Sequence, residues 1–195
     1  MHTQYRRHLP HIHPPGAALF LTMRLAGSLP QTVLEDVRTS AADLPSQCQR
    51  FASYEQQLET GSYGPTWLRQ PVVAALVLAG LRQQAANGHY ELTAACAMPN
   101  HLHVVLRLPL ASPEAFYRVL QRFKSTTAVL ANRALGRNGR FWQDESYDHV
   151  VREGQPEALA RAVRYTVHNP VKAGLCSQWQ AWEGTYLAQE WHELV

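Results

Sequence analysis

The sequence predicts an α+β domain built on an antiparallel sheet of β-α-β-β-α-β order with helices on one face. Three observations lead to this class. Residues 17–24, 90–98 and 102–108 are apolar runs of strand length. Stretches with helical spacing of apolar residues separate these runs. The 195 residues are enough for one sizeable core, with an extra helix and a C-terminal tail left over.

The first strand, over residues 17–24, follows a Pro-Pro-Gly turn. A helix is expected over 32–44, where Val33 and Val37 begin a roughly helical spacing of apolar residues just after Pro30. The polar residues 46–65 end in the turn-rich sequence Gly-Ser-Tyr-Gly-Pro. We interpret these residues as an insert between the secondary-structure elements of the core.

The middle of the chain predicts a helix, two strands and a second helix. Residues 72–87 are rich in alanine and leucine and end at an Asn-Gly pair, a common helix stop. Antiparallel strands follow at 90–98 and 102–108, joined by a Met-Pro-Asn corner. The Ser-Pro-Glu sequence at 112–114 is a helix-start signal for a long basic helix that ends near Gly136.

A short strand, Tyr147–Arg152, and a last helix from Glu157 to about His168 complete the predicted core. This helix should end near Asn169, because a proline such as Pro170 disfavours helix in the residue before it. When the extra helix is left out, the order of the elements is that of a ferredoxin-like or RRM-like sheet. Residues 1–175 would form the domain, and residues 176–195, with three tryptophans, a tail that packs on the core.

Composition excludes several classes of protein. The longest apolar runs, such as 72–79, are far too short to cross a bilayer. Residues 1–15 lack the apolar segment of a secretory signal, so we expect a cytoplasmic protein. Three widely spaced cysteines without a CxxC pair are expected to be reduced. The net charge of +3 is mild, but residues 115–143 carry no acid and six Lys or Arg, which suits a polyanion.

His101 and His103 flank Leu102 at the start of a predicted strand, so both imidazoles should point to one face. Two neutral imidazoles make a partial metal site, and the alternative is a histidine pair hydrogen-bonded in the core. The histidines at 2, 8, 11 and 13 have no such context, and we interpret them as part of a flexible arm.

Tyr165 and Asn169 are four residues apart on the last helix and therefore share a face. A hydroxyl nucleophile needs a polarised phosphate, which a divalent ion bound by His101, His103 and the Asn169 carboxamide oxygen could provide. Mixed nitrogen and oxygen ligands suit manganese or magnesium. The alternative is a core tyrosine with its hydroxyl at the surface.

Three segments together resemble the REP-associated tyrosine transposases, relatives of insertion-sequence transposases of the HUH class. They are MPNHLHVVL at 98–106, GRFWQDESYDHVVR at 139–152 and YTVHNPVKAGL at 165–175. The opening, YRRHLPHIHPPGAALFLTMRLAGSLP at 5–30, is similar to the start of one branch of that family.

The resemblance implies an enzyme in which Tyr165 attacks a phosphodiester of single-stranded DNA, leaving a 5′-phosphotyrosine and a free 3′ hydroxyl. His101, His103 and Asn169 would hold Mg²⁺ or Mn²⁺. The partners would be hairpins formed by repetitive extragenic palindromes, and a monomer is favoured over a homodimer. Two alternatives are a protein that binds hairpins without cutting them and a metal-dependent hydrolase with a water nucleophile.

The residues expected to contact DNA are mostly basic and would mainly touch phosphate. They are Arg118, Arg122, Lys124, Arg137, Arg140, Trp142 and Lys172. Phe141 and Trp142 could stack on an unpaired base, or else fill the edge of the core. Asp148 is either a carboxylate behind the metal ligands or part of a strand edge, and we favour the second interpretation.

Overall fold

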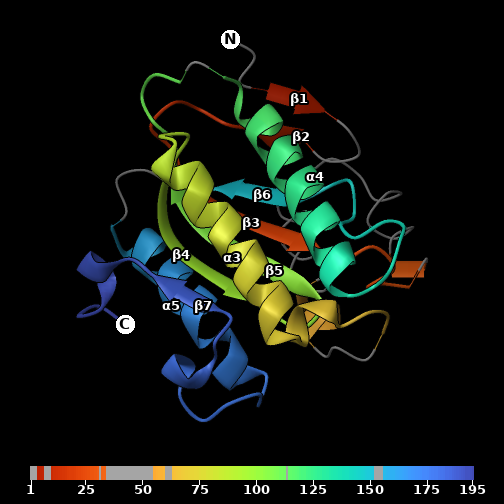
Figure 1. Ribbon diagram of the computed structural model, residues 1–195. Helices are drawn as coiled ribbons and strands as arrows, with labels where there is room; N and C mark the ends of the chain where they lie inside the picture. Colours follow the sequence, from red (N-terminus) through yellow and green to blue (C-terminus); the bar gives the residue numbers. More distant parts are fainter. Residues whose placement is uncertain are drawn as a thin grey trace.

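The computed structural model describes residues 4–6, 10–30, 32–33, 55–59, 63–112, 114–151 and 156–195 (Figure 1). Most of the helix expected over 32–44 and most of the insert at 46–65 lie outside these residues.

Five antiparallel strands form the central sheet, in the order β6-β3-β5-β4-β7. Their bounds are Ala18–Arg24 for β3, Glu91–Ala97 for β4, His101–Arg107 for β5, Tyr147–Val150 for β6 and Thr185–Leu187 for β7. The central strand, β5, pairs with β3 and β4 along its length. The order of β6, β3, β5 and β4 is the one that a split β-α-β-β-α-β pattern produces. The predicted fold class is therefore confirmed.

Helices cover both faces of this sheet (Figure 1). On one face, α3 (Pro71–Ala86) and α4 (Phe116–Ala134) pack against alternate residues of β3 and β5. On the other face, α5 (Pro156–Lys172) buries Val163 and Val167 against Phe20 and Val105. The prediction of helices on one face is correct for α3 and α4, whereas α5 adds a third layer.

The last helix continues through Pro170, so the predicted end near Asn169 is wrong. Proline lacks the amide hydrogen that a helix interior needs, and one helical hydrogen bond is lost there. The next turn offsets this loss. Gly174, with φ of +68°, closes the helix, while its amide donates to the Val171 carbonyl and the Leu175 amide donates to the Pro170 carbonyl. This pair of bonds is the Schellman arrangement, which satisfies the terminal carbonyls.

The start of α4 also differs from the prediction. Ala115 is the N-cap, and Ser112 makes its hydrogen bonds with Glu114, before the helix begins. The predicted end is confirmed, because α4 stops at Ala134 and Gly136 follows with φ of +61°. The serine therefore orders the turn before the helix and does not cap it.

One end of the described chain packs against the central sheet and the other adds a strand to it. At the N-terminal end, β1 (Gln4–Arg6) and β2 (Pro10–Ile12) form a hairpin, and β2 packs beside β6. His11 and His13 are buried there, so the flexible-arm interpretation is wrong for these two. At the C-terminal end, β7 pairs with β4, so the tail is part of the sheet.

Within the described ranges, no helix combines the length and apolarity needed to cross a membrane.

Candidate active site

Both imidazoles of the His-Leu-His sequence lie on the α5 face of β5, as strand alternation predicts. Their Nε2 atoms are 2.9 Å apart, and both side chains are buried. Leu102, between them, enters the core on the opposite face. The two rings therefore lie between β5 and α5, beside the apolar cluster that contains Val105 and Val167.

A second hydrogen bond fixes each ring. His101 Nδ1 lies 2.7 Å from Asn100 Oδ1, and the amide group of that asparagine donates to a backbone carbonyl. Because the asparagine oxygen accepts, the His101 proton is on Nδ1. His103 Nδ1 lies 3.0 Å from Thr22 Oγ1, and Thr22 donates to Glu55 at 3.2 Å. Since the threonine proton is used, the His103 proton is also on Nδ1.

These tautomers leave two unprotonated Nε2 atoms facing each other, an arrangement that a cation between them would stabilise. Burial lowers the pKa of His101 to about 3 and holds the pKa of His103 well below its usual value, so a proton binds the pair poorly. Adjacent ligands of an octahedral ion, at about 2.0–2.1 Å from it, are about 2.9 Å apart. The pair therefore fits two ligand positions of a divalent ion.

A proton on Glu55 gives a second arrangement of the same network. Glu55 would then donate to Thr22, Thr22 to His103 Nδ1, and His103 Nε2 to His101. Burial raises the pKa of Glu55 to about 7, although the hydrogen bonds from Tyr165 and Thr22 lower it. Protonation of Glu55 and ion binding at the histidine pair therefore oppose each other.

Tyr165 presents its hydroxyl to two carboxylates beside the histidine pair. The hydroxyl lies 2.8 Å from Glu55 and 2.7 Å from Glu59. The Tyr165 ring stands edge-on to that of His103, with centroids 5.5 Å apart. Burial and the negative carboxylates raise the pKa of Tyr165 far above its usual value, so the phenol stays neutral. Its activation needs a proton acceptor, and both carboxylates are in position to serve.

Asn169 lies one helical turn after Tyr165 and is 1% exposed. Neither its carboxamide oxygen nor its nitrogen makes a hydrogen bond within the described part of the chain. A buried polar group left in this state costs about 1–3 kcal/mol. Helical spacing places it on the same face as Tyr165. A bound ion or substrate group would supply the missing partner.

Lys172 completes the α5 side of the site. Its ammonium donates to Glu59 at 2.9 Å and lies 5.4 Å from the centroid of the Tyr165 ring. The side chain is 60% exposed, so the charge can also reach a bound anion. The structure thus brings Lys172 together with Tyr165.

Three residues of this site were not predicted from the sequence. Glu55 and Glu59 belong to the polar segment interpreted as an insert, and nothing in its pattern indicated where it packs. Arg24 ends β3 opposite His101 in the strand register, which puts it on the same face. It is 3% exposed, and its Nη1 makes no hydrogen bond among the described residues. A guanidinium with a free buried donor suits phosphate, and an arginine ending an apolar strand was the available signal.

Arg118 and Arg122, in the first two turns of α4, lie on the opposite face of the sheet from the histidine pair. Arg118 is exposed. Arg122 forms an ion pair at 2.8 Å with Glu114, the residue just before the acid-free stretch 115–143. These two side chains can therefore contact only a nucleic acid that extends beyond the active-site face.

The loop after α4 reaches the end of the sheet where β5 begins. The Ala26 amide donates to the Phe141 carbonyl at this end. Lys124 donates to two backbone carbonyls of this loop, and Arg140 pairs with Asp144. The guanidinium carbon of Arg137 lies 3.7 Å from the centroid of the Trp67 ring. These three basic side chains are therefore nearer to the candidate active site than Arg118 and Arg122 are.

Trp142 does not lie where a base could stack on it. It is 4% exposed, and its indole nitrogen donates to Thr127 at 2.9 Å. Phe141 is also buried, and its ring stacks on Trp67. Both aromatic rings therefore fill the core, as the alternative interpretation held, and we omit Trp142 from the proposed DNA contacts.

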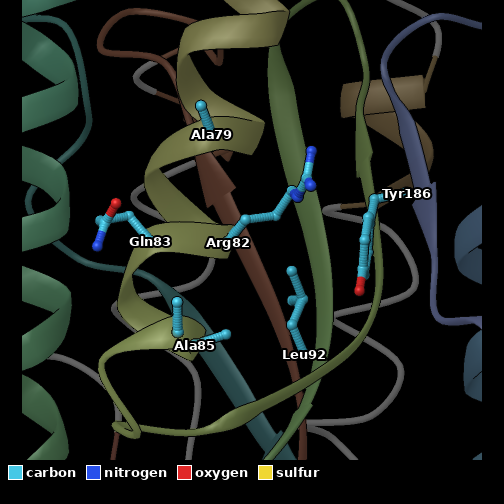
Figure 2. A pocket seen from close by; sticks show the side chains of 7 residues that line it. Ala79, Arg82, Gln83, Ala85, Leu92 and Tyr186 are labelled. Carbon is cyan, nitrogen blue, oxygen red and sulfur yellow. The ribbon is translucent and has the colours of Figure 1, made fainter.

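A surface hollow of about 460 Å³ lies on the α3 side of the sheet (Figure 2). Arg82 of α3 and Tyr186 of β7 line it, with Leu92 of β4 between them (Figure 2). Leu92 belongs to the core beneath α3, so this hollow and the histidine pair are on opposite faces. It takes no part in the candidate active site.

Two known proteins are similar to this chain. A Haemophilus influenzae protein assigned to the REP-associated tyrosine transposases is 26% identical in an alignment of 109 residues, which covers 52% of this chain and 61% of that protein. The chain thus spans about three fifths of the length of this relative. A solved structure of a REP-associated tyrosine transposase bound to a REP hairpin matches with a TM-score of 0.53 at 20% identity, covering 93% of this chain and 80% of that one. No family model matches.

Proposed function

We propose that this chain, which resembles the REP-associated tyrosine transposases in sequence and fold, is a metal-dependent endonuclease and strand transferase for single-stranded DNA at REP-type hairpins. One observation carries the proposal. The Nε2 atoms of His101 and His103 converge at 2.9 Å beside a tyrosine whose hydroxyl faces two proton acceptors.

Tyr165 is the proposed nucleophile. Its oxygen attacks phosphorus and forms the phosphotyrosyl bond, while the bond from phosphorus to the 3′ oxygen breaks. The phenolic proton passes to Glu55 or Glu59, and the departing 3′ oxygen takes up a proton to become a hydroxyl. Attack by that hydroxyl on the phosphotyrosine reverses the step and joins strands.

His101, His103 and Asn169 are the residues that would hold Mg²⁺ or Mn²⁺, and the ion would stabilise charge on the scissile phosphate. The unprotonated Nε2 pair and the unpartnered Asn169 carboxamide support this set. The amide oxygen and the phosphate oxygens of a bound strand suit Mg²⁺ or Mn²⁺, so the two imidazoles would supply only part of the ion's ligands.

Arg24 and Lys172 are the proposed phosphate contacts next to the chemistry. Both bring positive charge to a face that otherwise presents the carboxylates of Glu55 and Glu59 to an anionic strand. The basic side chains of α4 and the loop after it would contact the rest of the hairpin through its backbone. These are Arg118, Arg122, Lys124, Arg137 and Arg140.

Trapping a covalent adduct tests the proposal. The protein is incubated with a labelled single-stranded hairpin and Mn²⁺ and then separated on a denaturing gel. Wild type and the control Tyr186→Phe, altered on β7, should give a protein-linked band that requires the metal, and Tyr165→Phe should give none. Tight binding without an adduct would favour the non-cutting hairpin binder. Cleavage without an adduct would favour a hydrolase with a water nucleophile.

A further inference from the structure

A second pair of histidines separated by one residue lies on the opposite face of the sheet from the candidate active site. His11 belongs to β2 and His13 follows it, while Asp148 belongs to β6. Asp148 pairs with Leu21 in the strand register, so its side chain is on the α3 and α4 face. The His13 ring stands edge-on to Phe116, the first residue of α4, with centroids 5.0 Å apart.

The three side chains converge in a buried position. One possible ligand atom from each lies within 4.8 Å of the other two. His13 Nε2 is 2.6 Å from Asp148 Oδ2, and His11 Nδ1 contacts Oδ1 of the same carboxylate. The exposed fractions of the three side chains are at most 4%. Glu145 lies 3.5 Å from the other nitrogen of His11.

We propose that His11, His13 and Asp148 form a zinc site that fastens the N-terminal hairpin to β6. Two imidazoles and one carboxylate, with a fourth position open to water, are a ligand set typical of zinc. The two nitrogen ligands favour zinc over magnesium, which prefers oxygen. Glu145 would accept the second N–H of His11 and so hold the ring in the orientation that binding needs.

A proton competes with zinc for binding to His11 in this cluster. Burial disfavours charge on His11, but the hydrogen bonds and charges of Asp148 and Glu145 outweigh burial and raise the pKa of His11 to about 9. Zinc must displace that proton, so its affinity should rise with pH. Binding is therefore measured at pH 8.

The test uses the full chain with His101→Gln and His103→Gln, which removes the other imidazole pair. Native mass spectrometry counts bound zinc after dialysis, and competition with a chromophoric chelator gives the Kd. This double variant should bind one zinc ion per chain with a Kd below about 1 μM. Adding Asp148→Asn, which preserves side-chain size, should weaken binding by about 100-fold or more.

His13→Gln provides a second variant, and His168→Gln, exposed on α5, is the matched control that should keep the zinc. Circular dichroism establishes which variants fold, and His13→Gln decides alone if Asp148→Asn does not. Absence of zinc from the double variant would overturn the proposal. So would full zinc affinity in a folded Asp148→Asn or His13→Gln protein.

Discussion

Replacement of Glu55 by glutamine should make the metal-free protein more stable than wild type at alkaline pH, by a margin that grows with pH. Burial raises the pKa of Glu55 from 4.5 to about 7, so the folded chain holds this proton more tightly than the unfolded chain does. The stability linked to this proton is fully present below about pH 4.5 and is lost as pH rises through about 7. At about 1.36 kcal/mol for each pH unit of that interval, the loss is about 3 kcal/mol.

Urea denaturation in the presence of a chelator measures this effect. Between pH 5 and pH 8, the unfolding free energy of Glu55→Gln relative to wild type should increase by about 2–3 kcal/mol. Both proteins are compared at each pH, so the other titrating groups cancel. The exposed substitution Glu190→Gln should follow wild type throughout. A difference between Glu55→Gln and wild type that stays constant over this range would show that folding does not raise the proton affinity of Glu55.

Asn100→Ala removes the acceptor that orients His101, so titration calorimetry should show manganese binding weakened by about 10- to 100-fold. Arg118→Ala should reduce the slope of log affinity for a hairpin against log salt by about 1, whereas Arg164→Ala on α5 should leave that slope unchanged. Gly174→Ala should lower the free energy of unfolding by about 1 kcal/mol, because φ is +68° there, and thermal denaturation measures this loss.

Local pattern was sufficient for most of the sheet and for the orientation of the histidine pair. Alternation along a strand has a fixed period, so His101 and His103 had to share a face wherever β5 lay in the sheet. Helix stops at Asn-Gly and near Gly136 were also predictable, since both glycines adopt the positive φ that favours this residue. The same fixed helical period placed Tyr165 and Asn169 on one face.

Tertiary packing decided what local pattern could not. Glu55 and Glu59 reach Tyr165 across 110 and 106 residues of sequence, and the polar segment that carries them has no period that predicts this contact. The path of α5 through Pro170 depends on the Gly174 cap, which outweighs the preference of the residue before proline. The burial of His11 and His13 depends on Asp148, more than 130 residues away in the sequence.

Identifying the amino acid that carries the DNA tests directly whether Tyr165 is the nucleophile. After reaction with a hairpin and Mn²⁺, the protein is digested with nuclease and trypsin, which cuts after Arg164 and Lys172. The peptide 165–172 should carry a nucleotide 5′-phosphate on Tyr165. An unmodified peptide from a reaction that has cleaved the DNA, or a nucleotide on another residue, would contradict it.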